Sequence, residues 1–292
     1  MAEIVFLNGK LIPRSQAAIS ITDYGFLYGY GLFETMRAYQ GEVFRLEDHL
    51  RRLSASAEIL GLPIKTRELK SAVVRTIRAN RLASARVRIA ISGGEGEMNA
   101  DPGTCKSPTV LILAQKYKPY PESVYKKGLR AVVSSIRRNT GSPLTRLKSA
   151  SYLESIMVRQ EARKAGAEEA ICLNDKGFLA EASMSNIFIV TRGLLRTPGL
   201  DSGILAGITR EIVLELASQL GIPAAEDDIR QDELFDAEEA FLTNSLIEVM
   251  PLTEVDRRKI GSGRAGAITG VLLKAYRKLL PPTPRGRTIQ GT

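Results

Sequence analysis

Lys148 stands in a segment that is well suited to carry a reactive amine. Turn-forming residues precede it from Asn139 to Pro143, and the apolar spacing of residues 152–160 predicts a helix after it. A lysine at such a boundary combines a fixed backbone with a flexible side chain, and its neutral amine could attack a carbonyl carbon. The alternative is a solvated surface lysine, which is the commoner environment of this residue.

A second candidate site begins at Gly207, which precedes a predicted helix that ends near Leu220. The first backbone amides of a helix lack acceptors within the helix and lie at its positive end, so they bind phosphate readily. Thr209 would add a hydroxyl to these amides. Thr209 could also serve as an ordinary helix cap, so the pattern leaves both interpretations open.

A stretch rich in glycine and tyrosine runs from Asp23 to Gly31. Its glycines permit unusual dihedral angles and close approach of other groups, and its tyrosines, Tyr28 among them, carry hydroxyls on rigid rings. We predict a loop that either packs on its own rings or contributes to a site. It is not a dinucleotide-binding fingerprint, because the strand, turn and helix of that motif do not fit here.

His49 is the only histidine, which excludes any triad or metal site that requires more than one histidine. It falls in the first turn of a predicted helix with an apolar face, which favours a structural role. The two cysteines, Cys105 and Cys172, lie far apart in the sequence and form no metal or redox motif. We therefore expect ordinary thiols, no metal and a cytoplasmic location.

Composition narrows the class of protein further. The chain has 292 residues, 44% of them hydrophobic, which indicates two domains or one large one. No apolar run reaches the ~18 residues of a membrane span, and we expect no signal peptide. The net charge of +9 is dispersed rather than gathered in a basic run with aromatic residues, and tryptophan is absent. We expect no nucleic-acid or membrane partner, and small molecules as substrates.

The elements that must position these residues follow from their periodicity. Alternating strands and amphipathic helices fill both halves of the chain, and Asn8-Gly9 is a typical tight hairpin turn. On the strand 32–39, Leu32, Glu34 and Met36 share one face. We predict an N-terminal α/β domain over residues 1–115, a linker over 116–125, a larger domain over 126–280 and a flexible tail over 281–292. A polar loop, residues 93–107, is expected to be mobile.

Several segments together resemble the fold-type IV pyridoxal-phosphate enzymes, and the resemblance covers the chain from Ile4 to about Leu279. This family includes branched-chain aminotransferases, D-amino-acid aminotransferases and aminodeoxychorismate lyases. The motifs appear in the order that the family shows. They are Phe26–Thr35, His49–Leu53, Leu147–Leu153, Glu181–Phe188, Gly207–Arg210 and Thr243–Ser245.

The resemblance implies roles for individual residues. Lys148 matches the lysine that forms the Schiff base, or internal aldimine, with pyridoxal 5'-phosphate. Glu181 matches the carboxylate that faces the pyridine nitrogen, and Tyr152 the tyrosine that binds the phenolate oxygen. The phosphate would be held by Arg52, Ile208, Thr209 and Ser245.

The resemblance also implies a substrate pocket, and within the family it is greatest to the branched-chain aminotransferases. Tyr28 and Phe33 match side-chain-pocket positions, and Arg88 matches a residue that organises carboxylate binding. The implied substrate-binding residues are Tyr28, Phe33, Arg37, Arg88, Asn244 and Leu246. The backbone amides of residues 244–246 would donate hydrogen bonds to the substrate carboxylate.

The implied activity is transfer of an amino group between a branched-chain L-amino acid and 2-oxoglutarate. Thr35 and Asn244 depart from the branched-chain pattern and are similar to the lyases, and Arg86 replaces a frequent tyrosine. Aminodeoxychorismate lyase and D-amino-acid or (R)-amine transaminase therefore remain alternatives.

The implied fold is α/β (α+β), with a small α/β domain, a larger domain with a mixed, barrel-like sheet and flanking helices. The implied assembly is a homodimer or higher homo-oligomer.

Overall fold

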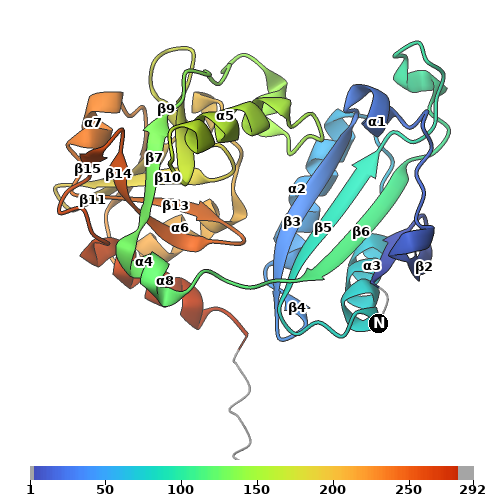
Figure 1. Cartoon of the computed structure of the whole chain (residues 1–292), viewed down its shortest axis with the longest axis horizontal. Helices are drawn as coiled ribbons and strands as arrows, with labels where there is room; N and C mark the ends of the chain where they lie inside the picture. Colours follow the sequence, from blue (N-terminus) through green and yellow to red (C-terminus); the bar gives the residue numbers. More distant parts are fainter. Residues whose placement is uncertain (1–2, 282–292) are drawn as a thin grey trace, which may run out of the picture.

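Two β-sheets, each with its own helices, lie side by side in the molecule (Figure 1). The structure is a computed structural model and describes residues 3–281. We call the first sheet with its helices the N-terminal lobe, and the second sheet with its helices the C-terminal lobe. The predicted flexible tail over 281–292 lies, from residue 282 on, outside the described residues.

The N-terminal lobe contains a six-stranded antiparallel sheet in the order β2-β1-β6-β5-β3-β4. Its strands are β1 (Ile4–Leu7), β2 (Lys10–Pro13), β3 (Gly31–Tyr39), β4 (Glu42–Val43), β5 (Ala85–Ser92) and β6 (Thr109–Lys116). Its helices are α1 (Tyr24–Tyr28), α2 (Leu46–Ile59) and α3 (Thr66–Ala79). The predicted β1–β2 hairpin turns through Asn8 and Gly9, whose φ angles of 45° and 91° are those that such a turn requires.

Side-chain alternation decides which face of this sheet is covered. On β5, Val87, Ile89 and Ile91 are buried in one hydrophobic cluster with residues of α2 and α3. Arg86 and Arg88 therefore point to the opposite face, because successive side chains of a strand alternate. That opposite face is turned toward the C-terminal lobe.

The C-terminal lobe contains a nine-stranded mixed sheet, part of which closes on itself. Strands β10, β13, β14, β7, β8 and β9 pair in this order, and β9 pairs again with β10. The strands are β7 (Leu129–Val133), β8 (Glu169–Leu173), β9 (Leu179–Ala182), β10 (Asn186–Thr191), β11 (Leu194–Pro198), β12 (Ala224–Asp227), β13 (Glu239–Asn244), β14 (Glu248–Val255) and β15 (Arg258–Lys259). The helices are α4 (Glu122–Lys127), α5 (Leu153–Lys164), α6 (Ile208–Gln219), α7 (Gln231–Phe235) and α8 (Ala267–Lys278). The predicted α/β class with a barrel-like mixed sheet is confirmed.

Local differences from the predicted elements have physical causes. Residues 24–28, expected as a loop, form α1, because Asp23 accepts a hydrogen bond from the amide of Gly25 and caps a short helix. The loop over 93–107 is fastened to α1 by the Tyr24 hydroxyl, which lies 2.9 Å from Thr104 Oγ1. The predicted linker over 116–125 overlaps the end of β6 and the start of α4.

Among residues 3–281, none of the helices combines the length and the apolar character that crossing a bilayer requires.

Candidate active site

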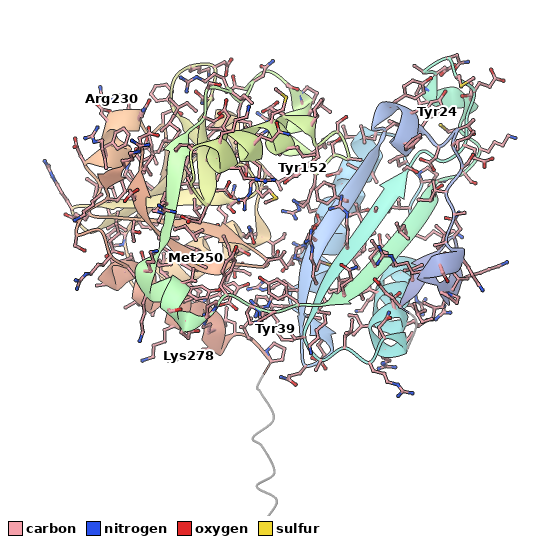
Figure 2. The ribbon with its side chains drawn as sticks, viewed as in Figure 1. Tyr24, Tyr39, Tyr152, Arg230, Met250 and Lys278 are labelled. Atoms are coloured by element: carbon pink, nitrogen blue, oxygen red, sulfur yellow. The ribbon has the colours of Figure 1, made fainter. Side chains whose placement is uncertain are left out.

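A cavity of about 610 Å³ lies between the lobes and is lined by residues of both. Figure 2 shows Tyr152 on the side of the C-terminal lobe that faces the N-terminal lobe. The volume is in the range of small-molecule sites. All the predicted site residues except Tyr28 and Arg37 line this cavity.

The backbone of the Lys148 segment belongs to the C-terminal half of the chain but is attached to the N-terminal lobe. The amide of Phe33 donates to the Lys148 carbonyl at 2.9 Å, and the amide of Ala150 donates to the Gly31 carbonyl at 2.8 Å. Leu147 is buried in the hydrophobic cluster of the N-terminal lobe. Lys148 is thus held at the start of β3, five residues before α5 begins at Leu153.

The Lys148 side chain enters the cavity with its amine 4.8 Å from the centre of the Phe33 ring. Burial, and then the charge of Arg52, lower the pKa of the Lys148 amine to about 8. Near neutral pH the neutral fraction of this amine is therefore larger than that of an ordinary surface lysine, although the charged form still predominates. This environment suits a nucleophile or a proton carrier.

Glu181 lies on β9 and reaches the same cavity. Its Oε2 accepts a hydrogen bond from the amide of Leu205 at 3.2 Å, and its Oε1 lies 3.3 Å from Arg138 Nη2. Burial raises the pKa of Glu181, and the charge of Arg138 opposes that rise. A carboxylate so placed can bind a protonated ring nitrogen.

The start of α6 lines one part of the cavity. The N-cap of this helix is Gly207, which has no side chain to cap the first amides, so Thr209 is not the capping residue. The amides of the first turn, including those of Ile208 and Thr209, therefore lack partners within the helix and lie at its positive end. A Cβ on Gly207 would lie 1.9 Å from Asn186 Oδ1, so only glycine fits between this helix and β10.

Arg52 reaches the same end of the cavity from α2. Its Nη1 donates to the carbonyl of Ala206 at 2.7 Å, one residue before the cap of α6. Ser245 also lines this end, and its hydroxyl lies 3.4 Å from His49 Nε2. An arginine, helix-end amides and two hydroxyls, those of Thr209 and Ser245, are a suitable set of donors for a phosphate.

Phe33 lies in another part of the cavity wall. The Tyr152 ring meets it edge-on with the ring centres 5.2 Å apart, and the Arg88 guanidinium lies 3.8 Å above it. Burial and the neighbouring charge of Arg86 lower the pKa of Arg88. This wall is partly aromatic and partly cationic, which suits a carboxylate with an apolar side chain.

Two predicted substrate residues lie elsewhere. Arg37 is buried against Glu248, with 2.8 Å between Nη1 and Oε1, and it donates to the Leu246 carbonyl at 3.2 Å. Its contact is therefore with the turn that carries Leu246. Tyr28 lines a separate pocket of about 260 Å³ beside the segment of Ser149 and is 42% exposed.

The turn over 244–246 differs in detail from the predicted carboxylate site. Asn244 Oδ1 accepts hydrogen bonds from the amides of Leu246 at 2.8 Å and Ile247 at 3.0 Å. These two amides are therefore already hydrogen-bonded inside the turn. Asn244 and Leu246 still line the cavity.

Sequence reasoning missed Arg138, which lines the cavity, and Glu34, which lies behind Arg52 and does not line it. Glu34 is fully buried and binds Arg52, and Arg138 is buried beside Glu181. Glu34 had a signal in the sequence, because it shares the apolar face of its strand with Leu32 and a buried carboxylate there requires a cation. Arg138 had no such signal, because its partner is distant in the sequence.

The residues present fit pyridoxal phosphate. The cavity contains a helix start that could accept a phosphate, a lysine with a lowered pKa and, on β9, a carboxylate that could pair with the ring nitrogen. The hydroxyl of Thr243, a residue that also lines the cavity, is buried and has no hydrogen-bond partner among the described residues. Residues 3–281 contain no cluster of His, Cys, Asp and Glu side chains that could hold a metal ion.

Comparison with known proteins gives consistent matches. The family model described as amino-transferase class IV matches residues 31–255. A branched-chain-amino-acid aminotransferase of Pseudomonas aeruginosa is 37% identical, over 94% of this chain and 91% of that protein. An aminodeoxychorismate lyase of Bacillus subtilis is 34% identical, over 94% of each chain. A solved branched-chain amino acid aminotransferase of T.th. with pyridoxamine 5'-phosphate has a TM-score of 0.91 and 31% identity, covering 95% of this chain and 94% of that one.

Proposed function

The chain belongs to the amino-transferase class IV family, and from this premise we propose that it transfers the amino group of branched-chain L-amino acids to 2-oxoglutarate. It is an aminotransferase, and its cofactor is pyridoxal 5'-phosphate. The observation that supports the residue assignments best is the placement of the Lys148 amine, Glu181 and the start of α6 in one cavity.

The bound cofactor supplies an electron-accepting ring, which stabilises the negative charge left when the substrate loses its α-proton. Lys148 is the group that takes this proton, and its lowered pKa lets the amine both accept and return it near neutral pH. Glu181 would keep the ring nitrogen protonated. Arg52 and the first amides of α6 would bind the phosphate and so help to orient the cofactor in the cavity.

Several features support the substrate proposal. The Phe33 ring provides an apolar contact for a branched side chain, and the Tyr152 ring packs edge-on against it. Arg88 supplies a charge for a carboxylate. The Pseudomonas aeruginosa relative, which is named a branched-chain-amino-acid aminotransferase, points to the same substrates.

The test is a half-reaction without an acceptor. Valine, leucine or isoleucine added to the holoenzyme should convert the absorption band of the bound aldehyde near ~400 nm into that of the amine form, and 2-oxoglutarate should restore it. Lys148→Ala should abolish both changes, whereas Lys118→Ala, a lysine at the rim of the same cavity, should retain them. A holoenzyme that does not respond to any branched-chain amino acid would contradict the proposal.

Aminodeoxychorismate lyase is the second candidate function. Thr35 and Asn244 both line the cavity, and the Bacillus subtilis relative carries that name. Release of pyruvate from aminodeoxychorismate, in the absence of any 2-oxo acid acceptor, would favour it. D-amino-acid or (R)-amine transaminase is distinguished in the same assay by offering both enantiomers of each donor.

We also propose that the enzyme is a homodimer and works in a reducing compartment such as the cytoplasm. Large apolar side chains on and around α1 are exposed, with Ile21 at 80% and Phe26 at 76%, and Met98 in the adjacent loop at 79%. Such a group of exposed apolar side chains is typical of an interface. Both Cys105 and Cys172 are free thiols. Light scattering of the wild-type protein and of Phe26→Asp would test the assembly, because the aspartate should weaken it.

A further inference from the structure

Glu34 is a carboxylate in a buried position, where a charge is costly unless other groups compensate it. Its side chain is completely inaccessible to water, on the face of β3 that packs against the helices. Burial alone would raise its pKa, but the charge of Arg52 and hydrogen bonds from His49 and Arg52 outweigh burial and lower the pKa of Glu34 to about 2. Glu34 is therefore an anion throughout the working pH range.

The contacts of Glu34 determine how Arg52 is oriented. Arg52 Nε donates to Oε1 at 2.8 Å and Nη2 donates to Oε2 at 2.7 Å, so the guanidinium is bound by two parallel hydrogen bonds. This geometry leaves Nη1 at the other edge, where it donates to Ala206 immediately before the cap of α6. The carboxylate thus directs the remaining edge of Arg52 to the start of that helix.

This orientation is electrostatically unfavourable without an anion. The start of α6 carries the positive end of the helix dipole, and the guanidinium of Arg52 lies beside it. Two positive groups repel each other unless a counter-charge holds them together. Glu34 supplies that negative charge at the Nε and Nη2 edge of Arg52, and a bound phosphate would supply it on the side of the cavity.

His49 extends the contact to the second lobe. Its Nδ1 lies 2.7 Å from Glu34 Oε2, and its Nε2 lies 3.4 Å from the hydroxyl of Ser245. The ring is buried, so it cannot rotate freely between these partners. A void of about 10 Å³ lies beside it, bounded in part by Thr209 and Tyr276. The chain of contacts therefore runs from Arg52 through Glu34 and His49 to Ser245, across the boundary between the lobes.

We propose that Glu34 and His49 are positioning residues for phosphate recognition, which hold Arg52 and Ser245 on opposite sides of one phosphate. Neither residue lines the cavity, so each acts through the group that it binds. This proposal rests on the proposed function, because it assumes that the phosphate belongs to pyridoxal phosphate. It assigns a function to the single histidine and to the buried acid of β3.

The test compares two ligands that differ only in the phosphate. Apo-protein is titrated with pyridoxal 5'-phosphate and with pyridoxal, and binding is followed by absorbance. Glu34→Gln keeps the shape of the side chain and removes its charge. It should weaken binding of pyridoxal phosphate about 10- to 100-fold, as is typical when a partner that orients a ligand-binding group is lost, and change the binding of pyridoxal less than about 3-fold.

A second variant keeps the proposal testable if Glu34→Gln does not fold. His49→Asn retains a donor for Glu34 but cannot reach Ser245, so it should give a smaller loss that is again confined to the phosphate ligand. The matched control is Glu226→Gln. Glu226 pairs with Arg210 on α6, at 2.5 Å, but does not line the cavity, and its loss should leave the ratio of the two affinities unchanged.

The outcomes separate this inference from the proposed function. The inference would be overturned if the Glu34→Gln and His49→Asn variants bound pyridoxal phosphate as tightly as the wild-type protein does. It would also be overturned if each variant lost affinity equally for the two ligands, because that result indicates a structural role only. Wild-type apo-protein that takes up neither ligand would contradict the proposed function instead. A loss confined to the phosphate ligand supports the inference.

Discussion

At the scale of single residues, reactivity depends on the environment rather than on the residue type. The chain has many lysines, but Lys148 has an amine whose pKa is lowered to about 8 by burial and by Arg52. The neighbouring Phe33 ring and the backbone bonds to β3 keep it in the cavity. Neutral amine and fixed position together distinguish it from a solvated lysine.

The lowered pKa of Lys148 predicts a pH profile. The rate at which apo-protein captures pyridoxal phosphate should increase about tenfold per pH unit below about 8 and level off above it, because only the neutral amine attacks. Stopped-flow absorbance between pH 6 and 10, values chosen to bracket the pKa of about 8, measures this rate. Lys148→Ala should show no capture, and a wild-type rate that does not depend on pH would contradict the assignment.

The same shift predicts the direction of a stability change in the apo-protein. Between pH about 8 and 10.5 the unfolded state binds more protons at Lys148 than the folded state does, so stability contributed by this residue rises with pH across that window. Lys148→Met should remove that rise in a series of urea titrations.

At the scale of elements, the start of α6 depends on close packing against β10. Asn186 at the beginning of β10 donates to the carbonyl of Leu205 at 2.9 Å, and its Oδ1 faces Gly207. The helix can approach so closely only because residue 207 has no side chain. The position of the first amides of α6, which we propose bind the phosphate, is therefore decided by contact between two elements.

Gly207→Ala tests that packing. Its Cβ would lie 1.9 Å from Asn186 Oδ1, so the buried Asn186 side chain or the first turn of α6 must shift. We expect a loss of stability of about 1–3 kcal/mol, typical of overpacking, and weaker binding of pyridoxal phosphate. Urea denaturation and ligand titration measure the two effects. Gly199→Ala is the matched control, because a Cβ there meets nothing within 4 Å, and it should change neither quantity.

At the scale of the whole molecule, the site exists only where the lobes meet. The Lys148 segment bonds to β3 of the N-terminal lobe, whereas Glu181 and α6 belong to the C-terminal lobe. A second connection is the buried pair of Arg37 and Glu248, and Glu248 also accepts from Arg277 of α8 at 2.8 Å. Separation of the lobes would therefore dismantle the cavity.

Glu248→Gln tests the connection between the lobes. It leaves Arg37 buried without its counter-charge, which should lower the free energy of unfolding by about 3–5 kcal/mol. Urea denaturation followed by far-UV circular dichroism suits a chain that lacks tryptophan. Glu254→Gln, on the same strand, should change the free energy by less than about 0.5 kcal/mol. Equal effects of the two substitutions would contradict a special role for the pair.

The sequence by itself determined most elements and the order of the site motifs. The alternation on β5 and the Asn8-Gly9 turn are local signals, so they predict local structure without knowledge of the rest of the chain. The motifs around Lys148 and Gly207 likewise identify the family, because each is a short, continuous segment. These are properties of neighbours in the chain.

Only the tertiary structure decided which distant residues meet. Arg37 binds Glu248 rather than lining the cavity, Arg138 meets Glu181, and Glu34 meets His49 and Arg52. The closure of β9 onto β10 and the attachment of the Lys148 segment to β3 are also non-local. The sequence shows which residues carry a charge that needs a partner when it is buried. Which residue becomes that partner depends on the packing of elements that lie far apart in the sequence.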